Sequence, residues 1–167
     1  MASNDRDRLE GWMNAWGTGV LRLCRMSLGD AHLAEDAVQE TFLRAWRALP
    51  KTALANEAHE KAWIFRIAVN VCRDMKRSAW WRHVDTRVSP EDLPPPAAEP
   101  DEESRELFAL VAGLPERLRQ PILLRYLSGL TLEETAKALG ISRPTLSKRL
   151  KEACRLLAVE WKGEDAT

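Results

Sequence analysis

The sequence predicts an all-α protein made of two small helical domains. Apolar residues recur at the three- and four-residue spacing of amphipathic helices over most of the 167 residues. Runs that alternate apolar and polar residues, as strands require, are absent from the sequence. A stretch rich in proline and acidic residues, 84–103, interrupts the helical pattern. The hydrophobic content of 45% is sufficient for packed cores on both sides of that stretch.

Residues 84–103 are expected to form a flexible linker. Proline cannot donate a hydrogen bond within a helix and restricts the residue before it. The segment is also acidic and nearly free of large apolar side chains, so it should stay extended and solvated. This boundary predicts domains at residues 5–83 and 104–162, and a polar linker between two small domains predicts relative motion. The prolines are Pro90, Pro94, Pro95, Pro96 and Pro100.

The first domain is predicted to contain helices near residues 6–28, 31–49 and 60–80. Gly29, between Ser27 and Asp30, separates the first two helices, and Pro50 ends the second. The second helix has two distinct arcs at 100° per residue. The apolar arc should face the core and contains Val38, Phe42, Ala45 and Leu49. The opposite arc either binds a partner protein or is a solvated face with one stray leucine; it contains Asp36, Gln39, Glu40, Leu43 and Arg47.

The third helix combines a core stripe with an unusual polar face. The expected core stripe is Ile64, Ile67, Ala68, Val71 and Met75. Trp63 falls outside this stripe, so the periodicity predicts that its ring is exposed. One face combines a ring that can stack, groups that can hydrogen-bond to base edges, and cations, and this combination is typical of nucleic-acid binding. The alternative is that Trp63 packs against a neighbouring helix and the arginines are merely solvated. The face comprises Trp63, Arg66, Asn70, Arg73, Asp74 and Arg77.

Residues 131–150 are predicted to form a helix-turn-helix motif. Thr131 and Glu134 have the spacing of a capping box, Gly140 suits the turn, and Ser142 can cap the next helix with Pro144 in its first turn. Leu146, Leu150, Ala153 and Leu157 should pack inward. The side chains left for bases and phosphates are Arg143, Thr145, Ser147, Lys148, Lys151 and Arg155. Such a hairpin can also be a packing unit, but its basic second helix favours DNA binding.

Two apolar segments should support this motif and complete a four-helix unit. The helix between Pro115 and Gly129 would contribute Leu118, Ile122, Leu123, Tyr126 and Leu127. A preceding helix would contribute Leu107, Phe108, Leu110 and Val111.

Composition and charge exclude several other classes of protein. The net charge is zero, yet residues 61–81 and 143–155 are basic and the strip between them is acidic, so the charge is divided between segments. The N-terminus lacks an apolar signal core and no eighteen apolar residues run together, which predicts a cytoplasmic protein. His32, His59 and His83 lack metal-ligand spacing, and no phosphate-binding glycine loop or nucleophile elbow is present. We therefore expect no catalytic residue, metal or cofactor.

The three cysteines are expected to be buried, reduced thiols. They lie on apolar helical faces and lack the spacing of a zinc site or a disulfide framework. Direct redox sensing by one of them is the alternative. They are Cys24, Cys72 and Cys154.

The order of these parts resembles the bacterial sigma-70 type factors of the extracytoplasmic-function (ECF) class. Residues 34–46, AEDAVQETFLRAW, are similar to sigma region 2.2. Residues 62–77, AWIFRIAVNVCRDMKR, are similar to regions 2.3 and 2.4. Residues 114–127 followed by the helix-turn-helix motif are similar to region 4. The resemblance covers nearly the whole chain and has the minimal two-region architecture of that class.

The resemblance implies a role for each face. The face with Asp36 and Leu43 corresponds to the surface that docks on the clamp coiled coil of the polymerase β-prime subunit. The polar face of the third helix corresponds to the reader of the minus-ten promoter element. The loop before that helix captures a base flipped out of the stack in this family, which here singles out Asn56 and His59. The helix that begins at Ser142 would read the minus-thirty-five element.

The resemblance also implies partners. The first is core RNA polymerase, bound through its β-prime clamp and β flap, and the second is promoter DNA. The third is an anti-sigma factor that hides the binding surfaces. In this family the anti-sigma factor is often anchored in the membrane and controls a stress response. Direct membrane insertion is not expected. In this chain Ser147 precedes Lys148, whereas many relatives have the reverse order, so base contacts are expected to differ. The alternative function is a stand-alone helix-turn-helix regulator, which would leave the second-helix and third-helix faces unexplained.

Overall fold

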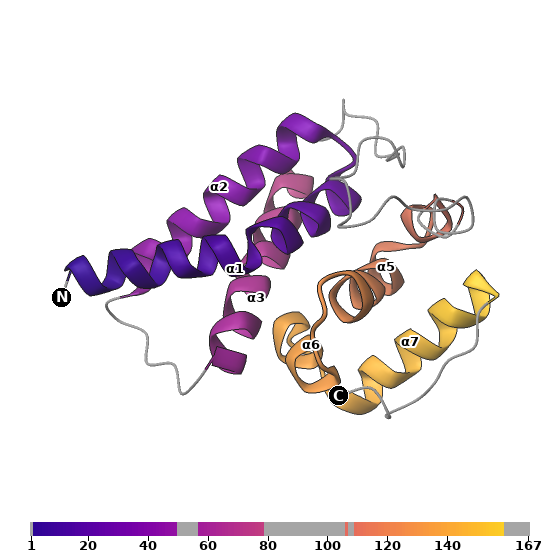
Figure 1. Cartoon of the computed structure of the whole chain (residues 1–167). Helices are drawn as coiled ribbons and strands as arrows, with labels where there is room; N and C mark the ends of the chain where they lie inside the picture. The colour runs from indigo at the N-terminus through magenta and orange to yellow at the C-terminus, as the bar shows by residue number, and fades with distance from the viewer. Residues whose placement is uncertain (1, 50–56, 79–105, 107–108, 159–167) are drawn as a thin grey trace.

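The computed structural model describes residues 2–49, 57–78, 106 and 109–158, and these residues are mostly helical (Figure 1). The first three helices are α1 (Ala2–Leu28), α2 (Ala31–Ala48) and α3 (Glu57–Arg77). They are followed by α5 (Glu116–Ile122), the π-helical turn η4 (Leu123–Leu127), α6 (Leu132–Leu139) and α7 (Arg143–Leu157). The predicted all-α class is confirmed for these residues. The predicted linker, 84–103, lies outside them.

The turn between α1 and α2 forms where the sequence predicts it. Gly29 has φ +73°, a conformation that costs glycine little, and its N–H donates to the Arg25 carbonyl at 2.9 Å. The Asp30 carboxylate then accepts from the backbone N–H of Leu33 at 2.8 Å and caps α2. The two helices therefore turn back on each other and lie side by side (Figure 1).

α3 is packed on more sides than a single core stripe predicts, because it contacts α1, α2 and α6. Ile64, Ala68 and Val71 are buried as expected, whereas Ile67 and Met75 are half-buried. The other contacts of α3 bury three more side chains that periodicity did not assign to the core. They are Ala62, Phe65 and Val69.

The helix-turn-helix motif has the local geometry that its sequence predicts. The Thr131 hydroxyl accepts from the Glu134 N–H at 3.1 Å, and the Glu134 carboxylate accepts from the Thr131 N–H at 2.8 Å. Gly140 has φ +68° in the turn, and the Ser142 hydroxyl accepts from the Thr145 N–H at 3.3 Å to cap α7. The predicted capping box, turn and cap are confirmed. The four inward positions of α7 are also buried: Leu146, Leu150, Ala153 and Leu157.

The apolar residues that support this motif are less uniformly buried than predicted. α5 contains Pro121, which has no N–H to donate, and the chain continues as the wider π-helical turn η4. The wider turn changes the phase of the helix, so Tyr126 is 51% exposed although 3.6-residue periodicity places it inward. Leu110 is 53% exposed, also against expectation. Leu107 and Phe108 lie outside the described residues.

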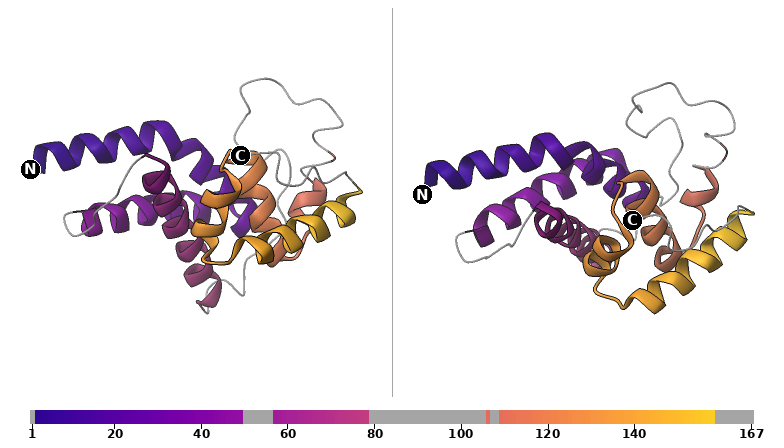
Figure 2. Two further views of the ribbon diagram at one scale, coloured as in Figure 1. Left: turned by 90° about the horizontal axis from the view of Figure 1, so that it is seen from below. Right: turned by 60° about the horizontal axis from the view of Figure 1, so that its bottom comes forward.

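The N-terminal helices α1–α3 and the C-terminal helices α5–α7 pack directly against each other. Their buried residues form one contiguous hydrophobic cluster, and α6 lies beside α3 (Figure 2). Polar contacts also cross the boundary. Lys76 Nζ is 3.1 Å from a Glu116 carboxylate oxygen, and Lys61 Nζ donates to the Gly129 carbonyl at 3.2 Å. This shared core differs from the independent motion that a polar linker predicts.

Candidate protein- and nucleic-acid-binding surfaces

The face of α2 that the sequence singled out for a protein partner lies at the surface. Asp36, Gln39, Leu43 and Arg47 are exposed and Glu40 is half-buried. Leu43 is 46% exposed, unusual for a leucine surrounded by charged and amide groups. We call these five residues the α2 face.

The α2 face borders an apolar groove between α1 and α2. The groove has a volume of about 700 Å³. Its apolar lining continues the exposed surface of Leu43 onto α1, so the two helices together present apolar area beside charged groups. Apolar area with a charged rim is typical of protein-binding surfaces. The apolar lining comprises Leu9, Met13, Val38, Phe42, Leu43 and Trp46.

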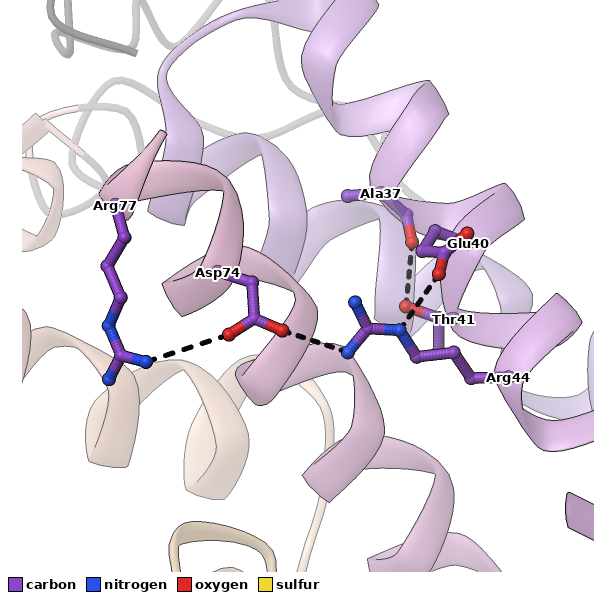
Figure 3. Close-up of polar contacts among 6 residues, drawn as sticks. All are labelled: Ala37, Glu40, Thr41, Arg44, Asp74 and Arg77. Carbon is purple, nitrogen blue, oxygen red and sulfur yellow. Dashed lines mark hydrogen bonds and ion pairs between the residues drawn. The ribbon is translucent and has the colours of Figure 1, made fainter. Parts of the chain in front are cut away.

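Arg44, which the arc analysis did not select, joins the α2 face to α3 (Figure 3). Its Nε donates to the Glu40 carboxylate at 2.9 Å and its NH1 donates to the Asp74 carboxylate at 3.0 Å. The hydrogen bond to Glu40 and the nearby Asp74 raise the pKa of Arg44 above its ordinary value. The i,i+4 spacing of Glu40 and Arg44 is the sequence signal that could have found the first contact. The contact with Asp74 depends on the packing of α2 against α3.

The predicted nucleic-acid face of α3 is mostly open to solvent. Arg66, Asn70, Asp74 and Arg77 are exposed, and Arg73 is half-buried. A row of guanidinium groups interrupted by an amide can neutralise phosphates and donate to base edges. Asn56, the other candidate before this helix, lies outside the described residues.

Trp63 is not exposed in the manner that periodicity predicts. Its ring is half-buried and meets the Trp12 ring edge-to-face, with centroids 5.6 Å apart and an interplanar angle of 71°. Trp12 in turn donates from Nε1 to Glu60 at 2.9 Å, and Glu60 also pairs with Arg8 at 2.8 Å. α1 covers part of α3 here, so Trp63 is half-buried against a neighbouring helix and not exposed as the periodicity predicts.

Two candidates on α3 lie against the helix-turn-helix motif. The Lys137 ammonium group is 3.0 Å from Nε2 of His59. A Cβ built on Gly140 would lie 3.5 Å from the Arg66 guanidinium, so Arg66 packs over the turn of the motif. The structure therefore brings one predicted DNA-binding module into contact with the other, which the sequence did not indicate.

The basic face of α7 is formed as predicted. Arg143, Lys148, Lys151 and Arg155 are exposed, while Thr145 and Ser147 are half-buried. A bidentate ion pair joins α7 to α5: Arg117 donates from both terminal nitrogens to Glu152, each at 3.1 Å. The hydrogen bonds from Arg117 lower the pKa of Glu152, which favours its charged carboxylate and so the ion pair between α5 and α7.

The cysteines are buried thiols, as expected. Two of them are nevertheless in contact, because packing of α1 against α3 places the sulfur atoms of Cys24 and Cys72 3.7 Å apart. The hydrogen bond with Cys72, followed by burial, raises the pKa of the Cys24 thiol. A raised pKa disfavours the reactive thiolate.

Metal-binding clusters and membrane-spanning helices are both absent from the described residues. They contain no cluster of three or more His, Cys, Asp or Glu side chains able to hold a metal ion. Within the same residues, no helix combines the length and apolar character needed to cross a lipid bilayer.

Two family models match the chain. The model of sigma-70 region 2 matches residues 12–82, and the model of sigma-70 region 4 matches residues 104–157. The first match contains all of α2 and α3, and the second contains the helix-turn-helix motif.

Curated relatives extend over most of the chain. The ECF RNA polymerase sigma factor SigL of Mycobacterium tuberculosis is 36% identical over 134 residues, which cover 77% of this chain and 75% of SigL. The ECF sigma factor ShbA of Streptomyces griseus is 37% identical over 140 residues, covering 74% and 71%. SigW of Bacillus subtilis is 26% identical over 168 residues, covering 90% and 89%.

Two solved structures share the fold. CnrH, in complex with the cytosolic domain of CnrY, superposes with a TM-score of 0.68 at 22% identity, covering 94% of this chain and 89% of that one. RpoE of Bartonella quintana, in complex with the anti-sigma factor NepR, superposes with a TM-score of 0.69 at 19% identity, covering 91% of this chain and 94% of that one. With both region models matched and relatives aligned over three quarters of their length, the chain belongs to the ECF RNA polymerase sigma factors, non-enzymatic subunits that direct RNA polymerase to promoters.

Proposed function

We propose that the α2 face docks on the β-prime clamp of RNA polymerase while α3 reads the minus-ten element and α7 the minus-thirty-five element. The observation that supports this most directly is the separation of three surfaces on one chain. The α2 face offers an exposed leucine among acidic and amide groups, whereas α3 and α7 offer cations. A stand-alone DNA-binding regulator would need only α7.

The α3 surface suits a promoter element that is read partly as single strand. Arg66, Arg73 and Arg77 can neutralise phosphates, and Asn70 can donate to and accept from an unpaired base edge. Trp63 presents only part of its ring, so it can stack against one base at most. Asn56 and His59 remain the candidates for holding a flipped base.

The α7 surface suits a duplex element. Ser142 caps α7 and leaves the first turn pointing outward, where Arg143 and Thr145 can meet base edges in a major groove. Lys148, Lys151 and Arg155 lie further along the exposed face and can contact phosphates. The Arg117–Glu152 pair links this helix to α5.

We also propose an anti-sigma partner, acting in the cytoplasm or holding this protein at the membrane. The structural neighbours CnrH and RpoE were each solved with a partner protein, CnrY and the anti-sigma factor NepR. This chain has apolar area available for such a partner in the groove between α1 and α2. The contact would compete with polymerase because Leu43 belongs both to the groove and to the α2 face.

Run-off transcription tests the proposal. Purified core polymerase is incubated with a genomic fragment library, with and without this protein, and the transcript starts are sequenced. New starts that share two spaced upstream motifs are the expected result. DNA binding without polymerase, combined with no new starts, would instead identify a stand-alone regulator.

The docking surface can be tested by charge reversal at Asp36. Asp36→Arg is expected to weaken binding to core polymerase at least about tenfold, which corresponds to about 1.4 kcal/mol, because like charges across an interface are strongly unfavourable. Glu35→Arg makes the same charge change at an exposed position of α2 outside the α2 face and should bind normally. Affinity is measured by fluorescence anisotropy on folded variants. Unchanged affinity of Asp36→Arg would reject the α2 face.

The phase of α7 predicts unequal effects at two neighbouring cations. Lys148 is exposed, whereas Arg149 is half-buried toward the core. Lys148→Ala should weaken minus-thirty-five binding by about 1 kcal/mol, roughly fivefold, and Arg149→Ala should weaken it less. Both are measured with duplexes containing the upstream motif found by run-off sequencing. Equal losses would contradict this phase.

A further inference from the structure

Asp74 lies between two guanidinium groups (Figure 3). Its Oδ2 accepts from Arg44 NH1 at 3.0 Å, while its Oδ1 is 3.7 Å from Arg77 NH1. The first contact has hydrogen-bond length and the second does not. One negative charge is therefore shared unequally, and Arg44 has the larger share.

Arg44 makes the stronger contact with Asp74 because Glu40 holds the Arg44 guanidinium in place. Glu40 and Arg44 are one turn apart on α2, and their 2.9 Å contact fixes the guanidinium of Arg44 before it reaches α3. Arg77 has no comparable second partner among the described residues, and its side chain is 77% exposed. A fixed partner loses less conformational freedom on binding a carboxylate than a mobile one does.

We propose that Arg44 is a positioning residue for the α3 surface: by occupying Asp74, it leaves the guanidinium of Arg77 available for a phosphate of promoter DNA. This role rests on the proposed minus-ten function of α3. Arg44 itself need not contact DNA. Its hydrogen bond to Asp74 offsets the charge of that carboxylate, and so leaves the positive charge of Arg77 available on the α3 surface.

Removal of Arg44 should allow Arg77 to pair more closely with Asp74. Asp74 and Arg77 are three residues apart on the same helix, which allows them to form a close ion pair. Arg77 would then have to leave Asp74 before it could bind a phosphate. One phosphate contact fewer lowers the salt dependence of DNA affinity by about 0.7–0.9 in the slope of log K against log salt.

The test uses the full chain bound to saturating core polymerase, on fluorescent promoter DNA chosen from the run-off starts, over a series of salt concentrations. Arg44→Ala is expected to bind this DNA several-fold more weakly and with the reduced slope. Arg44→Ala combined with Asp74→Ala should recover the wild-type slope, because the competing carboxylate is gone. Arg44→Lys should recover it only in part, since a lysine lacks the fork that reaches Glu40 and Asp74 together.

These variants separate a positioning role from the alternatives. A double variant that keeps the reduced slope would show that Arg44 contacts DNA itself and would overturn the proposal. Arg77→Ala alone shows how much of the salt slope one lost phosphate contact accounts for. The double variant Arg77→Ala with Arg44→Ala should have the same slope as Arg77→Ala. If Arg77→Ala lowers the slope and Arg44→Ala does not, only the role of Arg44 fails. If Arg77→Ala has no effect, Arg77 contacts no phosphate and the role of Arg44 fails. The minus-ten function of α3 fails only if Arg66→Ala and Arg73→Ala also leave promoter binding unchanged.

Discussion

Replacing Phe65 by alanine is expected to lower the free energy of unfolding by about 3–5 kcal/mol. Phe65 is 1% exposed and is among the largest of the fully buried side chains. Its ring lies directly on α1, since a Cβ built on Gly19 would stand only 3.2 Å from Phe65 Cζ. Removal of the ring leaves a cavity between α1 and α3 that two rigid helices cannot readily close. Because whole domains are stable by only about 5–15 kcal/mol, the variant should lose a large part of its stability.

Urea denaturation followed by circular dichroism measures this loss. Leu43→Ala is the matched control, because it also removes a large apolar side chain but at a position that is 46% exposed. Its stability should change by no more than about 0.5 kcal/mol. A loss below about 1 kcal/mol in Phe65→Ala would contradict the packing of α3 on α1.

Charge reversal at Glu116 is expected to destabilise the boundary between the N-terminal and C-terminal helices. Burial and the nearby Arg119 lower the pKa of Lys76, and Glu116 acts in the opposite direction. Glu116→Lys would place three cations together and put a positive charge in the first turn of α5, where a negative one is favoured. The pair is neither fully exposed nor fully buried, so we expect a loss of about 2 kcal/mol.

Thermal unfolding measures the effect of Glu116→Lys. The shared core predicts one cooperative transition, and 2 kcal/mol corresponds to a fall in Tm of about 4–8 °C for a chain of this size. Combining Glu116→Lys with Lys76→Glu restores opposite charges and should recover much of the loss, though not the favourable charge at the start of α5. An unchanged Tm in the single variant would show that the Lys76–Glu116 contact does not stabilise this boundary.

Local signals were sufficient to predict much of the fold from the sequence. The capping box at Thr131, the turn at Gly140 and the cap at Ser142 depend on residues within a few positions of one another. The exposure of Leu43 follows from the phase of one helix. For this reason the all-α class, the α2 face and the basic face of α7 were predictable.

Features that depend on contacts between helices were not predictable in this way. Trp63 is half-buried because Trp12, far away in the sequence, packs on it. Arg44 joins two surfaces only because α2 lies against α3. Cys24 and Cys72 touch for the same kind of reason. Tyr126 is exposed because a π-helical turn shifts the helix phase, which a fixed period of 3.6 residues cannot anticipate.

The contact between Lys137 and His59 has a consequence for promoter geometry. Elements centred near positions −10 and −35 are about 25 base pairs apart, which is about 85 Å of duplex at about 3.4 Å per pair. A protein in which α6 lies against α3, with side-chain nitrogens 3.0 Å apart, cannot span that distance. The chain itself can, because residues 79–105 join the two halves and a stretch of that length reaches about 90 Å when extended.

If α3 and α7 read the two elements as proposed, the promoter affinity of the free protein is proportional to the fraction of molecules in which the two halves have separated. Each tenfold decrease in that fraction raises the apparent Kd tenfold. A polymerase that binds the halves at distant positions removes this cost before any DNA arrives. The same sigma factor would thus bind a promoter weakly when alone and tightly within the holoenzyme, with no difference in its DNA contacts.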